Sequence, residues 1–415
     1  MSHPWIVVVG IGEDGLEGLT PAARVLVEKA ELLVGGERHQ AFVAETSAVR
    51  LTWKDGLDAA MAEMEKWRGR RVVVLASGDP MCFGAGVNLQ RRFGSDDLAV
   101  LPVPGSLALA CARMLWSEPD VEMVTLHGRP MDSFRLHVAP GARLVVLSQD
   151  GETPAKVAAM LVDMGYGPSR LAVLEHMGGP REGRVDGLAR DWRHLRCADL
   201  NAIAVECLPG PAAMRRPRVP GLPDEAYVSD GQLTKREVRA VTLAALAPLP
   251  GELLWDLGAG SGSVAIEWLR AAPRTQAVAV EGRPDRCAAI ALNAARLGVP
   301  RLKVVEGDIL SAIDNLSPAP DAIFLGGGVA RAGMLEACFA ALRPGGRLVA
   351  NAVTLEAERV LLGFAGGELR RIEISHPRKV GGTTVWEAKA PVTQIFLSKP
   401  ENQPMSVLSS QADRR

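Results

Sequence analysis

A glycine-rich segment near the middle of the 415-residue chain constrains what the second half can fold into. Asp256 lies in an apolar run and is followed by Gly258, Gly260 and Gly262. Glycines let the backbone turn sharply and approach a ligand where a Cβ atom would collide. The helix after such a turn offers free N–H groups at its start. The spacing therefore predicts a strand, a tight loop and a helix that together bind a nucleoside.

Two acids at predicted strand ends indicate S-adenosylmethionine as the ligand. A dinucleotide-binding fingerprint reads G-x-G-x-x-G, whereas this segment has closer glycines preceded by an acid. Glu281 ends the predicted strand 276–280, at a spacing suited to an acid that accepts from both ribose hydroxyls. Asp308 lies just past a third predicted strand, where a carboxylate can accept from the adenine amino group. The predicted cofactor-binding residues of this half are Asp256, Gly258, Ala259, Gly260, Ser261, Gly262, Glu281, Asp308 and Ile309.

Two further predicted strands extend the pattern. Residues 321–325 form an apolar run that ends in three glycines, and residues 347–351 follow a turn at Pro344. The order of glycine loop, ribose acid, adenine acid and glycine-ended strand resembles class I methyltransferases. That resemblance implies a Rossmann-like α/β domain. A turn without a ligand is the alternative for the glycines, and a solvated loop acid is the alternative for Glu281.

The first half contains another series of short strands that end in turns. Apolar strands are predicted at 5–9, 71–76 and near 100–103. Thr20 is predicted to cap a helix that begins at Pro21. The turns after the three strands are G-I-G-E-D-G from Gly10, S-G-D-P-M-C-F-G from Ser77 and P-G-S from Pro104.

With these turns the first half resembles the tetrapyrrole (corrin and porphyrin) methylases. The resemblance implies a class III fold, in which S-adenosylmethionine lies folded between two α/β lobes. It also implies that Gly10, Asp79, Gly105 and Ser106 bind this cofactor. The family's first loop usually reads G-x-G-P-G, whereas Glu13 stands here in place of the proline, which leaves substrate entry at this loop open. An aspartate that only initiates a turn is the alternative for Asp79.

Together the two halves resemble a family in which both folds are fused: the decarboxylating precorrin methyltransferases of cobalamin (vitamin B12) biosynthesis. The resemblance implies methylation of precorrin-6B at carbons 5 and 15, with decarboxylation of a ring acetate and two S-adenosylmethionine sites per chain. The fused arrangement is similar to that of the cobalt-free route. Residues 221–239 resemble the family's entry to its second domain, where Thr234 would cap the first helix and reach the cofactor.

Composition fits a chain of two α/β domains. We expect a tetrapyrrole methylase domain over 1–208 and a class I methyltransferase domain over 227–400. The proline-rich stretch 209–226 has no apolar period and is predicted to be a stiff linker. The polar tail 401–415 is predicted to be disordered.

Charge and cysteine content exclude several kinds of partner. The 47 basic and 48 acidic residues nearly cancel, so nucleic acid is not an expected partner. No apolar run has the length of a membrane span, and the N-terminal apolar run is too short for a signal peptide. The six cysteines show no metal-ligand spacing, so we expect no metal and a reducing cytoplasm. The family resemblance implies a homo-oligomer, with a tetramer built through the C-terminal domain.

The sequence does not identify a catalytic residue. Methyl transfer from a sulfonium requires mainly alignment of donor and acceptor and exclusion of water, and the meso carbons of a reduced tetrapyrrole are electron-rich. Arginines near predicted strand ends or loops could bind substrate carboxylates or could be surface residues; they are Arg38, Arg129, Arg331 and Arg378. Histidines of the first half could tune a proton or could be structural; they are His39, His127 and His176.

Two other functions remain open from the sequence. A tRNA adenine methyltransferase has a similar class I core, although such amino-directed enzymes often carry an N/D-P-P-Y box where Leu325 and three glycines stand here. Alternatively, the first half is a non-catalytic module that binds the tetrapyrrole for the second half. A module of that kind need not bind the methyl donor, so cofactor stoichiometry separates the two cases.

Overall fold

The computed structural model describes residues 4–44 and 46–401. The chain divides into two units. Unit 1 contains the residues up to Arg129 and His137–Met214, and unit 2 contains Pro130–Leu136 and the residues from Arg215 on. The predicted tail lies outside the described residues, apart from Glu401.

The first lobe of unit 1 is a parallel sheet in the order β3-β2-β4-β1-β5. Its central strands are runs of valine and leucine that are buried, as expected for a parallel sheet covered on both faces. The strands are β1 (Ile6–Ile11), β2 (Leu32–Val34), β3 (Val49–Leu51), β4 (Val72–Ser77) and β5 (Leu98–Leu101). The helices are α1 (Pro21–Glu28), α2 (Glu37–Ala41), α3 (Leu57–Met64) and α4 (Ala85–Phe93); α5 (Ser106–Met114) follows β5 and packs against the sheet of the second lobe. Thr20 caps α1 through its hydroxyl, as predicted.

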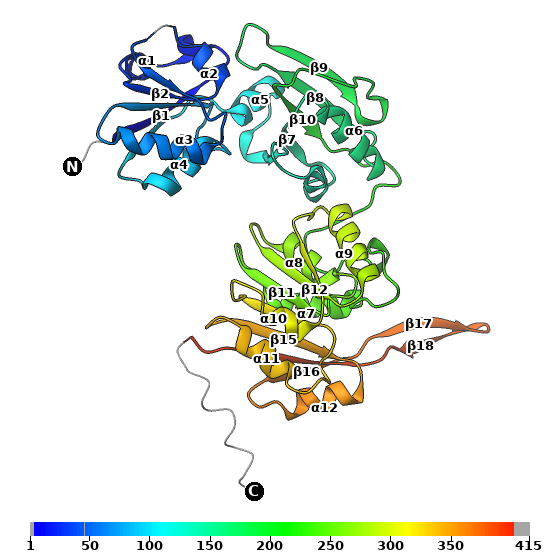
Figure 1. The fold of residues 1–415 in the computed structure, drawn as a ribbon. Helices are drawn as coiled ribbons and strands as arrows, with labels where there is room; N and C mark the ends of the chain where they lie inside the picture. Colours follow the sequence, from blue (N-terminus) through cyan, green and yellow to red (C-terminus); the bar gives the residue numbers. More distant parts are fainter. Residues whose placement is uncertain (1–3, 45, 402–415) are drawn as a thin grey trace. The chain divides into compact units, whose positions relative to one another are not determined.

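The second lobe of unit 1 is a mixed sheet in the order β6-β7-β10-β8-β9. The last strand of the unit, β10, lies in the middle and runs antiparallel to both of its neighbours. Its elements are β6 (Val121–Thr125), β7 (Arg143–Leu147), α6 (Thr153–Asp163), β8 (Arg170–Glu175), β9 (Gly183–Leu188) and β10 (Asn201–Glu206). Unit 1 therefore has the two α/β lobes that the sequence predicted (Figure 1).

Unit 2 is built on a seven-stranded sheet in the order β13-β12-β11-β14-β15-β19-β16. The first five strands of this order are parallel, and β19 is antiparallel to β15 and β16. The strands are β11 (Leu253–Leu257), β12 (Gln276–Glu281), β13 (Lys303–Glu306), β14 (Ala322–Leu325), β15 (Arg347–Ala352), β16 (Glu368–Ile372) and β19 (Val392–Ser398). The helices are α7 (Arg236–Leu246), α8 (Ser263–Ala271), α9 (Pro284–Arg296), α10 (Ile309–Ile313), α11 (Met334–Ala341) and α12 (Leu355–Gly363).

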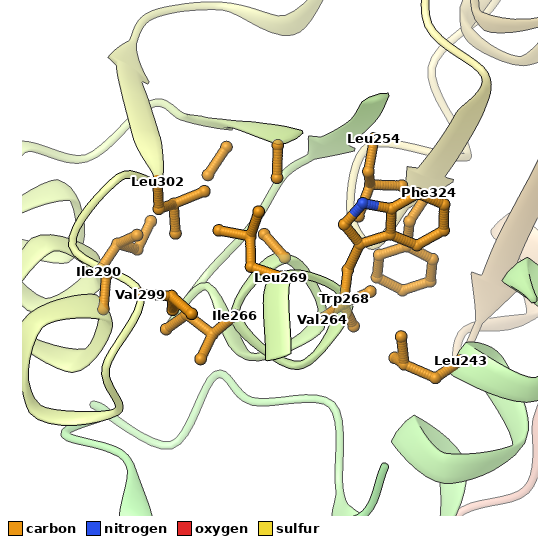
Figure 2. Packing of buried hydrophobic residues seen from close by; sticks show 14 of the residues in the cluster. Leu243, Leu254, Val264, Ile266, Trp268, Leu269, Ile290, Val299, Leu302 and Phe324 are labelled. Carbon is orange, nitrogen blue, oxygen red and sulfur yellow. The ribbon is translucent and has the colours of Figure 1, made fainter. Parts of the chain in front are cut away.

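Alternate residues of each central strand of unit 2 enter separate cores, because side chains alternate between the two faces of a sheet. Leu254 of β11 packs with Trp268 of α8 and Phe324 of β14 (Figure 2). The next residue, Trp255, belongs to the other core, together with Ile323 of β14. Helices therefore cover both faces, which leaves the carboxyl ends of the strands to form a site.

A hairpin of β17 (Ser375–Val380) and β18 (Thr383–Ala388) is inserted between β16 and β19. It extends away from the sheet of unit 2 (Figure 1). Nearly all of its side chains are exposed, including Trp386. The sequence analysis did not predict this hairpin, since the alternation of its residues is not matched by a buried face.

The predicted helix cap at Thr234 is wrong. Helix α7 begins at Arg236, its N-cap is Lys235, and no side chain caps it. The carbonyl of Thr234 instead accepts a hydrogen bond from the guanidinium of Arg239. That bond lets the chain enter the helix one residue later than predicted. No helix in the described part of the chain is long and apolar enough to cross a membrane.

Candidate active sites

The glycine loop of unit 2 joins β11 to α8. Gly258, Gly260 and Gly262 have φ values of +71°, +59° and +74°, which residues with a Cβ atom rarely adopt. A Cβ atom on Gly258 would also lie 2.9 Å from the backbone nitrogen of Gly327, and one on Gly260 would lie 2.9 Å from the carbonyl oxygen of Gln232. Both conformation and space therefore require glycine in this loop.

Glu281 is held against the glycine loop. It ends β12, and its side chain is almost fully buried. One carboxylate oxygen accepts from the backbone N–H of Gly260 at 2.9 Å, and the other accepts from that of Arg283 at 3.1 Å. These two bonds fix the carboxylate at the wall of the neighbouring cavity, where it could accept from ribose hydroxyls.

Asp256 lies behind the loop, with no exposed surface. Its Oδ2 accepts from the backbone N–H of Ala265 in the first turn of α8 at 2.9 Å, so it acts as a cap supplied from a strand. Its Oδ1 has no hydrogen-bond partner within the described part of the chain. Burial is the main cause that raises the pKa of Asp256 to about 7; the hydrogen bond from Ala265 opposes this rise and the nearby charge of Glu281 contributes to it. The geometry gives this acid a role in positioning the loop and α8.

Asp308 is the N-cap of α10 and lies at the end of β13. It accepts from the backbone N–H of Ser311 at 3.3 Å and pairs with Arg331. The hydrogen bond from Arg331 lowers the pKa of Asp308. Arg331, a candidate for binding a substrate carboxylate, therefore already pairs with a carboxylate of its own chain. Arg378 is similar, since it lies on β17 and pairs with Glu387 at 3.0 Å.

A cavity of about 1090 Å³ opens at the carboxyl ends of the parallel strands of unit 2. Ligand pockets typically hold about 300–1,000 Å³, so this cavity has room for a nucleoside and a second large molecule. Predicted residues that line it are Thr234, Gly258, Ala259, Gly260, Glu281, Asp308 and Ile309. Predicted residues outside its lining are Asp256, Ser261 and Gly262.

Several lining residues of the cavity were not predicted. Gly326 and Gly327 follow β14, a motif noted in the sequence, and face the glycine loop. His376 and Lys389 come from the base of the unpredicted hairpin, where the backbone N–H of Lys389 donates to the carbonyl of Ile374 at 2.8 Å. No local motif marks these two residues, because their position depends on the antiparallel end of the sheet.

A strap of residues 221–235 forms one wall of the same cavity. The strap is anchored by Glu267 of α8, a nearly fully buried acid. Glu267 accepts from the backbone N–H of Leu222 at 3.0 Å, from the hydroxyl of Tyr227 at 2.9 Å and from Nε of Arg239 at 2.7 Å. Arg239 is itself fully buried and also donates to the carbonyls of Leu222 and Thr234. One buried ion pair therefore fixes both ends of the strap.

The corresponding region of unit 1 is a cavity of about 90 Å³ at the strand ends of both lobes. Of the predicted cofactor-binding residues of unit 1, Ser106 lines it. Gly10 lies behind it, where a Cβ atom would be 2.0 Å from the carbonyl oxygen of Gly78. A Cβ atom on Gly105 would lie 3.5 Å from Asp79. Three turns therefore meet where the tetrapyrrole methylase resemblance implied a cofactor.

Asp79 makes the local contact expected of an aspartate that initiates a turn, which was the alternative to a cofactor-binding role. Its Oδ1 accepts from the backbone N–H of Met81 at 2.9 Å, which is an Asx turn. This contact is compatible with a second bond from Asp79 to a ligand, because a carboxylate has several acceptor sites.

Charged residues of both lobes converge on Glu13 at the wall of this cavity. Nη1 of Arg38 donates to one carboxylate oxygen at 2.5 Å, and Nδ1 of His176 lies 3.0 Å from the other. Arg181 reaches the second oxygen at 3.8 Å. The side chain of Glu13 is 9% exposed. Arg38 and His176 were predicted as separate candidates, and the structure brings them together through Glu13.

His39 lies next to this cluster. Its Nε2 lies 2.9 Å from the hydroxyl of Ser77 and 2.9 Å from Nη2 of Arg38. Burial, with Arg38 as a second cause, lowers the pKa of His39 to about 4, so the ring is neutral near pH 7. The other two predicted basic residues of unit 1, His127 and Arg129, are exposed in the turn after β6.

Each unit thus places glycine turns at strand ends beside a cavity, and the folds are those of two classes of methyltransferase. In the described part of the chain, no group of three or more His, Cys, Asp or Glu side chains is arranged as metal ligands. The glycine cradle and the fixed Glu281 carboxylate fit the nucleoside part of S-adenosylmethionine in unit 2.

Comparison with known proteins gives the family. Residues 6–192 match the Tetrapyrrole (Corrin/Porphyrin) Methylases, and residues 225–399 match the Precorrin methyltransferase domain. A precorrin-6Y C(5,15)-methyltransferase [decarboxylating] from Sinorhizobium sp. is 46% identical over 400 residues, which cover 95% of this chain and 97% of that protein. The chain therefore belongs to the family of decarboxylating precorrin-6Y C(5,15)-methyltransferases.

Two shorter relatives each cover less than half of the chain. A cobalt-precorrin-7 C(5)-methyltransferase from Salmonella typhimurium is 29% identical over 43% of this chain and 87% of its own length. A probable cobalt-precorrin-6B C(15)-methyltransferase (decarboxylating) from Pyrobaculum aerophilum is 34% identical over 42% of this chain and 93% of its own length. The predicted family, fold class and enzyme class are confirmed, and the tRNA methyltransferase alternative is not favoured.

Proposed function

We propose that the chain methylates precorrin-6B at carbons 5 and 15 and removes carbon dioxide from a ring acetate, with one S-adenosylmethionine site in each unit. The observation that supports two sites is the recurrence of glycine turns beside a cavity in both units. Membership of the family supports the substrate and the reaction.

We assign methylation at carbon 15 and decarboxylation to unit 2, and methylation at carbon 5 to unit 1. The two shorter relatives support this division, because their names separate the C(5) activity from the decarboxylating C(15) activity. Unit 2 also has the larger cavity, which suits two operations on one bound macrocycle. Both operations draw on the electron density of the same conjugated ring.

The residues of the chain contribute alignment more than acid–base chemistry. S-adenosylmethionine supplies an electrophilic methyl group, which an electron-rich ring carbon can attack in line. In unit 2 the glycine loop and Glu281 would orient the donor, and the strap anchored by Glu267 would exclude water from the reacting atoms. Loss of carbon dioxide needs an electron sink, which the protonated macrocycle can supply when the pocket holds it in that tautomer.

A second function for unit 1 has one observation in its favour. Its cavity of about 90 Å³ is much smaller than the roughly 300 Å³ of ordinary ligand pockets, so a cofactor would require the cleft to widen. If the cleft stays closed to the donor, unit 1 would be a module that only binds the tetrapyrrole. A cytoplasmic location and a homo-oligomer, a tetramer through unit 2, stay predictions.

Cofactor stoichiometry separates the two functions of unit 1. Calorimetry of the full chain with S-adenosylmethionine should give two sites, and Gly258→Arg should reduce them to one, because its side chain fills the space beside Gly327. Mass spectrometry should then show that Gly258→Arg no longer methylates precorrin-6B at carbon 15. Given the decarboxylated, C15-methylated tetrapyrrole, the same variant should still methylate carbon 5. A wild-type stoichiometry of one would refute the second cofactor site.

A further inference from the structure

Glu13 is a single carboxylate surrounded by three basic side chains of unit 1. Arg38 comes from α2 of the first lobe, whereas His176 and Arg181 come from the segment after β8 in the second lobe. The backbone of this loop is also packed closely, since a Cβ atom on Gly179 would lie 2.5 Å from that of Glu13. The acid therefore bridges the two lobes at the wall of the cavity.

The basic side chains exceed what one carboxylate needs. Arg38 uses Nη1 on Glu13 and Nη2 on Ser77 and His39, so its planar donor face lies along the cavity wall. Arg38 and Arg181 keep 39% and 72% of their side-chain surface exposed, so both guanidinium groups are accessible to a ligand. Glu13 supplies one acid from the chain itself. A planar guanidinium beside an imidazole is also the geometry that binds carboxylates of ligands.

We infer that Arg38, His176 and Arg181 form a binding site for a side-chain carboxylate of the tetrapyrrole, and that Glu13 occupies this site until the substrate displaces it. This inference rests on the proposed function of unit 1. Displacing Glu13 also removes the contact that bridges the lobes, so the small cavity would widen as the substrate binds. Glu13 is thus a competitor for the substrate and not a catalytic residue.

The methionyl group of S-adenosylmethionine is another possible source of a carboxylate. Its ammonium group lies next to its carboxylate and would be repelled by the guanidinium groups of Arg38 and Arg181. The acetate and propionate groups of a tetrapyrrole carry no adjacent cation. The cluster therefore fits the substrate better than the donor.

The test measures the KM of the full chain for the decarboxylated, C15-methylated tetrapyrrole in methylation at carbon 5. Glu13→Gln keeps the size and removes the competing charge, so KM should fall by about tenfold, as expected when one charge-assisted bond no longer has to be broken. Arg38→Gln should raise KM by a similar factor. Glu17→Gln changes an exposed acid nearby and should leave KM unchanged. Thermal unfolding of each variant checks that the fold is intact.

A direct binding titration of the same tetrapyrrole separates this inference from the proposed function. If the wild-type chain transfers no methyl group to carbon 5 while Glu13→Gln still tightens binding, the proposed function fails and the carboxylate site stands. A folded Glu13→Gln variant with a higher KM, or with no turnover, would overturn the inference, since Glu13 would then assist the reaction. A fall in the KM for S-adenosylmethionine alone would overturn the assignment to the substrate.

Discussion

Asp256 and Glu281 lie on neighbouring strands and are both buried, yet their surroundings differ. Both oxygens of Glu281 accept hydrogen bonds at the cavity wall, whereas one oxygen of Asp256 has no partner among the described residues. Burial without compensation disfavours the charged form of an acid, which explains the raised pKa of Asp256. The same motif thus contains one acid suited to a ligand and one suited to supporting the loop.

The raised pKa of Asp256 predicts a pH dependence of stability. In the unfolded chain its pKa is near 3.9, and in the folded chain it is about 7, so folding takes up a proton between these values. The contribution of Asp256 to the free energy of unfolding should therefore fall as pH rises from about 4 to 7 and stay low above 7. Asp256→Asn should remove this fall, so the variant should gain stability relative to the wild type at pH 8. Urea unfolding of the wild type and the variant at pH 5.5 and pH 8 measures their difference in stability. An equal difference in the free energy of unfolding at both pH values would contradict the assignment.

Substitution of Glu281 should weaken cofactor binding and leave the fold intact. Glu281→Ala should weaken S-adenosylmethionine binding in unit 2 by roughly 1–3 kcal/mol, because ribose hydroxyls and the N–H of Gly260 lose a charged acceptor. The exposed Glu306→Ala, at the end of the adjacent strand, is the matched control, and Asp79→Ala should leave the unit 2 site unchanged. If calorimetry finds that Glu281→Ala binds S-adenosylmethionine in unit 2 with normal affinity, the assignment of Glu281 to the ribose hydroxyls is wrong.

At the residue level the sequence predicted the glycine loop well, because three left-handed conformations in one loop leave little choice of residue. It placed Glu281 and Asp308 at strand ends for a similar reason, since β12 ends at Glu281 and β13 ends two residues before Asp308; their contact with a cofactor stays a prediction. It did not predict the cluster around Glu13. That acid and His176 are far apart in the chain, and only the packing of two lobes brings them to 3.0 Å.

Among the elements, the strap 221–235 is the least regular part of unit 2 and among the most firmly anchored. Removing one partner of a buried ion pair leaves an uncompensated charge, which costs about 3–5 kcal/mol. Glu267→Ala should therefore destabilise unit 2 by that amount and weaken its cofactor binding, since the strap lines the cavity. Glu336→Ala removes an exposed acid on α11 that does not line the cavity and serves as the control. Unchanged urea unfolding of Glu267→Ala would contradict the anchoring role.

Element prediction succeeded where strands are buried on both faces and failed elsewhere. The strands β11, β12 and β14 are apolar runs that end at glycine-rich or acidic turns, and both signals agree. The short strands β2 and β3 were missed, because three residues carry too little periodicity. The start of α7 was misplaced by one residue, since Lys235 and not Thr234 is the N-cap and a guanidinium from the next turn binds the threonine carbonyl.

At the scale of the whole molecule, the division into two units predicts that each unit folds without the other. The N-terminal piece 1–214 and the C-terminal piece 215–415 should each fold when expressed alone, even though Pro130–Leu136 remain in the first piece. A C-terminal piece that begins at residue 221 should be less stable. It lacks the carbonyls of Arg216 and Pro217, which accept from Arg270, a buried cation. Thermal unfolding of both C-terminal pieces measures the difference.

Product analysis of the same pieces tests the division of labour. The C-terminal piece, given precorrin-6B and S-adenosylmethionine, should add one methyl group and release one carbon dioxide. The N-terminal piece should then add the second methyl group. A product of the C-terminal piece that gains a methyl group and keeps its carbon dioxide would place the decarboxylation elsewhere.

The position of the last strand in each unit has a consequence for synthesis on the ribosome. Strand β10 lies between β7 and β8, and β19 lies between β15 and β16, so the second-lobe sheet of unit 1 and the sheet of unit 2 are each completed only by the last strand of their unit to be translated. Until β19 emerges, β15 and β16 present open edges to other nascent chains. Unit 1 can close while unit 2 is still being translated. A message interrupted before the codon for Val392 would therefore yield a complete unit 1 joined to an incomplete unit 2.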